Sequence, residues 1–177
     1  MTTDLRYPIG RFALDGEVSE ERRAGWITEL SEAPAQLRAA VHGLSDEQLE
    51  TPYRPGGWSL RQVVHHLPDS HLNAYTRFKL ALTEDTPTIR PYEEARWAEL
   101  PDTALTPIGV SLMLLESLHR RWVVLLKSMD EREWRREFYH PEQERTMRLD
   151  RVLALYAWHG KHHIAHIVST RDRMGWR

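Results

Sequence analysis

The chain has 177 residues, 41% hydrophobic and 28% charged, a composition typical of one globular domain spanning residues 1–177. Its net charge of −2 gives no basic excess for a phosphate backbone, and no apolar run approaches the roughly 20 residues of a membrane span, so neither nucleic acid nor a membrane is an expected partner. The absence of cysteine excludes disulfides, a thiolate zinc site and a cysteine nucleophile, so any metal must use nitrogen and oxygen ligands.

Residues 1–18 precede the first helical pattern. They lack the charged opening and apolar stretch of a signal peptide, so we expect a cytoplasmic location. Tyr7, Pro8, Ile9 and Phe12 give the segment an apolar character. This predicts an N-terminal arm that lies on the body of the protein or on a neighbouring subunit.

Apolar residues at helical spacing predict four long helices. Start and stop residues support them: capping boxes at Ser45 and Ser59, Pro107 at a first helical position, and glycines at 43 and 175. The expected ranges are 20–41, 59–83, 107–129 and 149–174. Together they predict an all-α four-helix bundle.

Two connections carry expected structure of their own. Residues 84–105 hold three prolines and form a long crossover between the second and third long helices, with a short helix expected over 92–100. Residues 137–140 and 145–148 flank a polar turn and predict a small hairpin before the fourth long helix.

Four histidines lie within eight residues of the fourth long helix. At ~100° per residue, His159 and His163 fall in the middle of the stripe expected to face the core, His166 lies close beside it, and His162 falls on its flank and is expected to be solvated. Two imidazoles four residues apart lie one above the other and can bind a single metal ion.

The second long helix carries a polar strip beside its apolar stripe, formed by Ser59, His66, Ser70, Asn73 and Arg77. Such a strip is typical of a ligand cleft between helices, whereas His65 is expected to point to solvent.

We therefore predict a metal site formed by His66, His159 and His163, with at least one position open for water or substrate. Zinc or nickel is the expected ion, one per subunit, and manganese or iron fits the same ligands. His71 and His119 also face inward, and we interpret them as hydrogen-bonded core residues. Pro68 lies inside the second long helix and is expected to kink it.

Several segments resemble the DinB-like, YfiT-like family of bundle metalloproteins. They are residues 58–71 (WSLRQVVHHLPDSH), 73–84 (NAYTRFKLALTE), 118–122 (LHRRW) and 156–166 (YAWHGKHHIAH), in the family's order. The resemblance implies a four-helix bundle, often a homodimer, with a divalent metal on three histidines. By motif position these are His66, His159 and His163, and Pro68 stands where relatives usually have alanine.

The chemistry stays open between two reactions. A metal on three neutral histidines acidifies bound water, for hydrolysis, and deprotonates a bound thiol, for thiol transfer. No carboxylate base is evident, since Gly160 and Lys161 follow His159 and Asp69 should point outward. This mildly favours a thiol S-transferase that uses a low-molecular-weight thiol such as bacillithiol, an activity that the resemblance also implies for some relatives.

The alternative is a metal-dependent hydrolase using metal-bound water, the description common for the YfiT branch. In either reaction Ser70, Asn73 and Arg77 are candidates for orienting water or an anionic substrate. A third alternative is a non-catalytic, metal-binding stress-response bundle. A non-catalytic protein of this kind is expected to have a coordinatively closed site, with His119 or His166 as a fourth ligand.

Overall fold

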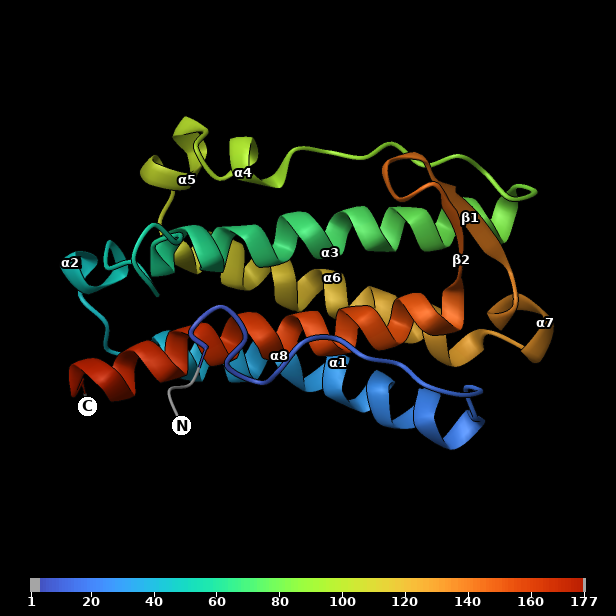
Figure 1. The fold of residues 1–177 in the computed structure, drawn as a ribbon, viewed down its shortest axis with the longest axis horizontal. Coiled ribbons are helices and arrows are strands. Elements are labelled where there is room, and N and C mark those ends of the chain that lie inside the picture. Colours follow the sequence, from blue (N-terminus) through green and yellow to red (C-terminus); the bar gives the residue numbers. More distant parts are fainter. Residues whose placement is uncertain (1–3, 177) are drawn as a thin grey trace.

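Four long helices dominate the structure, a computed structural model that describes residues 4–176 (Figure 1). Their bounds lie within one residue of the expected ones, so the predicted four-helix bundle is confirmed. They are α1 (Glu20–Val41), α3 (Leu60–Thr83), α6 (Ile108–Ser128) and α8 (Leu149–Met174). None of the helices described is both long and apolar enough to cross a membrane.

The helices start where local sequence satisfies their free backbone groups. Ser59 accepts from the Gln62 backbone N–H at 3.2 Å, and the Gln62 side chain accepts from the Ser59 backbone N–H at 2.9 Å. The same exchange between Ser45 and Gln48 begins the short helix α2 (Asp46–Leu49). Pro68 lies inside α3, which continues through it to Thr83.

Short elements occupy the connections. The crossover forms α4 (Glu94–Trp97), inside the range expected to be helical, and α5 (Pro101–Leu105), which the sequence interpretation missed. The sequence interpretation also missed α7 (Glu131–Trp134), whose first turn is capped by the side chain of Asp130. The expected hairpin is present as β1 (Glu137–His140) and β2 (Arg145–Arg148), joined by a 3-10 turn (Pro141–Gln143) and paired antiparallel with Glu137 opposite Arg148.

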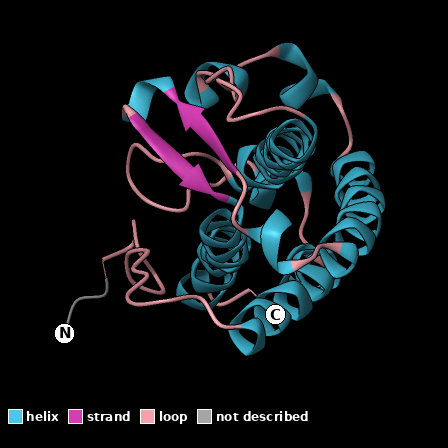
Figure 2. Cartoon of the chain, turned by 90° about the vertical axis from the view of Figure 1, so that its right-hand side faces the viewer, coloured by secondary structure: helices cyan, strands magenta, loops and turns pink. Residues whose placement is uncertain are grey.

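The long helices pack in a ring. α1 and α3 each pack against both α6 and α8, so the order around the bundle is α1–α6–α3–α8. Figure 2 shows the long helices nearly end-on, with the two-stranded sheet at one side. α3 and α8, which carry the predicted metal ligands, are therefore direct neighbours.

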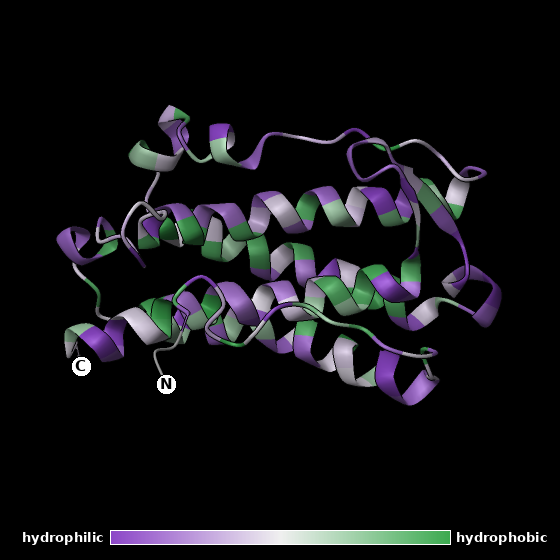
Figure 3. Ribbon diagram, viewed as in Figure 1, coloured by the Kyte–Doolittle hydropathy of each residue, from purple (hydrophilic) through white to green (hydrophobic). Residues whose placement is uncertain are grey.

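The core has two apolar halves. The half near the hairpin is built around Trp122, Phe78 and Leu153, and the first turns of α8 there are mostly hydrophobic in Figure 3. The other half contains Leu37, Leu60, Leu115 and Ile167 among its buried residues. At the junction, α3, α6 and α8 contribute buried or partly buried histidines, so a polar layer separates the two halves.

The N-terminal segment lies on α8 of the same chain. The Tyr7 ring lies 5.9 Å from the His162 ring, the Phe12 ring lies 5.9 Å from the Trp158 ring, and Arg151 donates to the Gly16 carbonyl oxygen. Figure 1 shows this segment crossing α8. Of the expected arm, residues 1–3 lie outside the described residues.

Candidate metal centre

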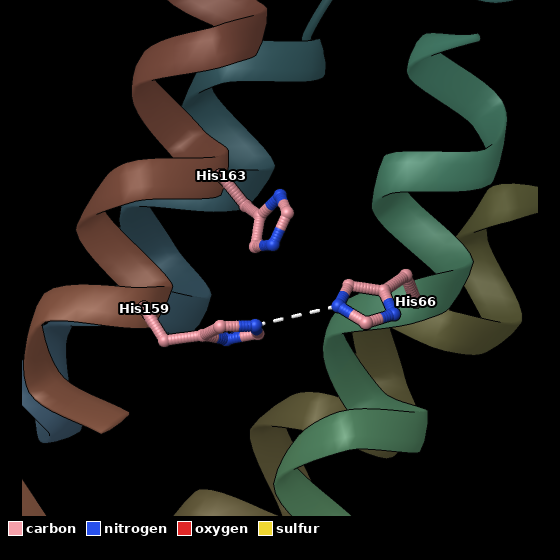
Figure 4. Close-up of side chains that lie close together, drawn as sticks. All are labelled: His66, His159 and His163. Carbon is pink, nitrogen blue, oxygen red and sulfur yellow. Dashed lines mark hydrogen bonds between the residues drawn. The ribbon is translucent and has the colours of Figure 1, made fainter. Parts of the chain in front are cut away.

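Three imidazoles converge between α3 and α8. His66 extends from α3, and His159 and His163 extend from successive turns of α8 toward it (Figure 4). One ring nitrogen from each lies within 4.8 Å of the other two, and the Nε2 atoms of His66 and His159 are 3.3 Å apart. Metal–nitrogen bonds of ~2.0–2.1 Å in a tetrahedral site place ligand nitrogens roughly 3.3 Å apart, which the His66–His159 distance matches, while the nitrogen of His163 lies within 4.8 Å of both.

Burial keeps these rings neutral, which is the form that binds a metal. Removal from water lowers the pKa of His66 to about 4. The same cause, reinforced by the neighbouring histidines, lowers the pKa values of His159 and His163 well below the ordinary value.

A chain of hydrogen bonds runs from His159 into the core. His159 Nδ1 lies 3.2 Å from His71 Nε2, and His71 Nδ1 lies 2.9 Å from His119 Nε2. His119 Nδ1 lies 2.6 Å from the carbonyl oxygen of Leu30 on α1. His71 and His119 are fully buried, as expected of hydrogen-bonded core residues.

This series of hydrogen bonds determines which ring nitrogen of each histidine carries the proton. A carbonyl oxygen only accepts, so His119 Nδ1 donates and, in the neutral ring, His119 Nε2 accepts. His71 must then donate from Nδ1 and accept at Nε2, which makes His159 a donor at Nδ1. The lone pair of His159 is thereby left on Nε2, the atom that faces His66. Through this relay, a backbone carbonyl on α1 sets the ligand atom of a histidine on α8.

The three histidines line a pocket of about 610 Å³. Ser70 and Arg77 of α3 line it as well, whereas Asn73 faces a neighbouring hollow and donates from its side-chain amide to the Asp69 carbonyl oxygen. The structure therefore brings two of the three candidate orienting residues to the histidines.

Three other polar side chains lie in surroundings that differ from those predicted from the sequence. His65 and His162 were expected in solvent, and both predictions are wrong, since each is only 7% exposed. His65 is covered by α6, where its Nδ1 lies 2.7 Å from Ser111 Oγ, and His162 stacks on Trp158 beneath the N-terminal segment. Asp69 is half-buried rather than outward, and burial raises its pKa to about 6.

Neither histidine considered as a fourth ligand joins the cluster. Both nitrogens of His119 are engaged, by Leu30 and His71. His166 uses Nε2 at 3.2 Å from the carbonyl oxygen of Arg6 and stacks on Tyr53. Among residues 4–176, the cluster capable of holding a metal consists of three histidines.

Sequence reasoning missed several residues that line the pocket. They come from connections without helical periodicity: Arg6, Tyr7, Tyr53, Arg54, Tyr92 and His140. Trp58, which directly precedes the first residue of the α3 capping box, lies with its ring 4.7 Å from that of His66. No local pattern marks these residues, because only the packing of the connections on the bundle brings them to the site.

Comparison with known proteins assigns the family. Residues 29–167 match the model of the DinB superfamily. Proteins of Bacillus mycoides (strain KBAB4) and Bacillus cereus (strain 03BB102), each named "Putative metal-dependent hydrolase", are 54% identical over 173 residues, which cover 98% of this chain and 99% of theirs.

A solved structure agrees with this assignment. YfiT from Bacillus subtilis, described as "a probable metal-dependent hydrolase with an unusual four-helix bundle topology", superposes with a TM-score of 0.96 at 50% identity, covering 98% of this chain and 99% of that one. The match contains both histidine segments identified from the sequence. The chain belongs to the DinB superfamily and is a close relative of YfiT.

Proposed function

We propose that this protein is a metal-dependent hydrolase acting on a small molecule. The observation that carries the proposal is the convergence of three neutral histidines in a pocket of about 610 Å³. A divalent ion there, with zinc or nickel preferred to manganese or iron, would act as a Lewis acid that lowers the pKa of water. The names of the relatives agree with hydrolysis. A homodimer and a cytoplasmic location stay predictions.

The residues of the chain divide the remaining work. His66, His159 and His163 would hold the ion, and the His119–His71 relay keeps the Nε2 lone pair of His159 directed at it. Tyr156 lines the same pocket, and burial raises the pKa of its hydroxyl, so the group stays a neutral hydrogen-bond donor. The apolar rings of Trp58 and Tyr156 limit the water around the histidines.

Thiol S-transfer is a second candidate, favoured by a separate observation. The carboxylates that line the pocket in the described part of the chain, Glu94 and Glu142, are both exposed. A thiol of pKa ~8.5 needs less help from a base than water does. A low-molecular-weight thiol such as bacillithiol would be the cosubstrate.

Metal content tests the shared part of both proposals. Plasma mass spectrometry on untagged protein should find about one equivalent of divalent metal, lost in His66→Ala and His163→Ala. The matched control is His42→Ala, because His42 is exposed at the end of α1. A wild type that stays empty when offered zinc or nickel would remove both enzymatic proposals.

Activity assays then distinguish the hydrolase from the transferase. Hydrolysis of simple esters or amides without thiol, lost in His163→Ala, supports the hydrolase. Turnover of electrophiles only when a thiol is supplied supports the transferase. A protein that holds metal and stays inactive in both assays would support the non-catalytic bundle.

A further inference from the structure

We propose that Arg77 forms an anion-binding subsite, so that the substrate carries a carboxylate or phosphate group away from its reacting bond. The inference deepens the proposed function, because the subsite lies in the pocket of the three histidines. It rests on the burial of Arg77, on the lack of a carboxylate partner for it in the described part of the chain, and on its position on α3.

Arg77 differs from the other buried arginines. Three arginines in the described part of the chain are buried: Arg23, Arg61 and Arg77, with 6%, 9% and 9% exposure. Arg23 pairs with Glu131, and Arg61 pairs with Asp46 and Glu50. Arg77 has no carboxylate within 4.0 Å among residues 4–176.

A buried charge without a partner is costly, and proteins normally compensate it. Within the described residues, the Arg77 guanidinium has one weak acceptor, the Arg90 carbonyl oxygen at 3.5 Å. Most of its hydrogen-bond capacity thus remains available in the pocket that it lines. A planar guanidinium pairs with carboxylates and phosphates through two parallel hydrogen bonds, which gives the class of ligand.

The position of Arg77 on α3 sets the reach of such a ligand. Arg77 follows His66 by eleven residues, or about 16 Å along the helix axis at ~1.5 Å per residue. Helical side chains lean back toward the N-terminus, which brings the guanidinium to a distance on the order of 10 Å from the histidines. The anionic group of the substrate would therefore lie several bonds from the reacting atoms.

The pocket wall near Arg77 suits an anion. Ser70, Tyr92 and Tyr156 line the pocket with hydroxyl groups, and burial raises the pKa values of both tyrosines, so they remain donors. His140 lines the same wall, and burial followed by the positive charge of Arg77 lowers its pKa. The exposed carboxylates Glu94 and Glu142 are screened by solvent more strongly than the charge of Arg77, which is only 9% exposed.

Small probes test the subsite with and without metal. Hexanoate, hexyl phosphate and neutral hexanamide are titrated by calorimetry into metal-free and zinc-loaded protein. We expect at least one anion to bind about tenfold or more tightly than hexanamide in both states, a preference lost in Arg77→Gln and partly kept in Arg77→Lys. Whichever of the two anions binds more tightly shows whether the natural ligand carries a carboxylate or a phosphate group.

The matched control is Arg6→Gln. Arg6 lines the same pocket, but it is exposed and paired with Asp4, so its loss should leave the preference nearly unchanged. Circular dichroism and thermal unfolding check that each variant is folded.

The outcomes keep this inference separate from the proposed function. A preference that depends on Arg77 in a protein that never binds metal supports the subsite while the enzymatic proposal fails. The subsite is overturned if wild type shows no preference, if Arg77→Gln retains it, or if it appears only with zinc and survives in Arg77→Gln.

Discussion

The candidate metal ligands differ in what contacts the ring nitrogen that faces away from the metal site. His159 has its Nδ1 bonded to His71, whereas His163 Nδ1 is buried without a hydrogen-bond partner in the described residues. A ligand whose second nitrogen is held binds metal in one orientation and one tautomer. The relay through His71 and His119 therefore gives His159 the best-defined position of the three.

Replacing His71 by leucine tests the relay. The change removes the acceptor for His159 Nδ1, and such outer partners typically contribute 10–100-fold to metal affinity. Chelator competition should show zinc affinity reduced by that order in His71→Leu. His71→Gln should retain more, since its amide oxygen can accept from His159.

Nitrogen-15 NMR supplies a readout that simple packing would not change. Metal-free wild type should show His159 protonated at Nδ1, and His71→Leu should show a mixture of tautomers. His65→Gln is the control, because His65 is also buried on α3 but is bonded to Ser111. Unchanged zinc affinity in a folded His71→Leu protein would rule out this role.

At the scale of elements, the ends of the helices could be read locally and the connections could not. Ser45, Ser59 and the hairpin residues form their expected structures because each depends on neighbours three to eleven positions away. α7 was missed because it spans only four residues, three of them charged, and is too short to show helical periodicity, although Trp134 within it is buried. The crossover pairs with the hairpin, where Ile89 N–H donates to the Tyr139 carbonyl oxygen at 3.0 Å, a contact that local patterns do not encode.

The capping box of α3 yields a prediction at this scale. Ser59→Ala removes the side-chain acceptor for the Gln62 N–H and should lower the free energy of unfolding by about 1 kcal/mol. Urea denaturation measures this loss of unfolding free energy, and the m value should stay unchanged. Ser128→Ala, which changes an exposed serine at the end of α6, should stay within about 0.5 kcal/mol of wild type. Equal losses in the two variants would contradict the prediction.

For the whole molecule, the polar layer between two apolar core halves makes stability depend on pH. Burial lowers the pKa values of His66, His119 and His162 to about 4, against ~6.5 in the unfolded chain. Between these values the unfolded state binds more protons, so the free energy of unfolding falls as the pH falls from about 6.5 toward 4. Above pH 6.5 these groups add no slope.

Denaturant unfolding of metal-free protein at pH 7, 6 and 5 measures this dependence. Each such histidine contributes about 1.4 kcal/mol per pH unit within the window. His162→Gln should reduce the slope by about one proton, whatever its effect on stability at pH 7. A free energy of unfolding that stays constant from pH 6.5 to 4.5 would show that the histidines are not buried as neutral groups.

The sequence by itself determined the four long helices, the hairpin and the face of α8 that presents His159 and His163. Helical periodicity and capping are local properties, so spacing along the chain is sufficient to read them. It also indicated His66, because a polar residue beside an apolar stripe marks the edge of a helix interface.

Only the tertiary structure decided what surrounds those residues. The direct contact of α3 with α8, the relay from Leu30 to His159 and the burial of His65 and His162 all join residues far apart in the chain. Likewise, no carboxylate of residues 4–176 is brought close enough to pair with Arg77. Each depends on which helices become neighbours and which connections cover them. Periodicity assigns a face to each helix, but it does not say which element will pack against that face.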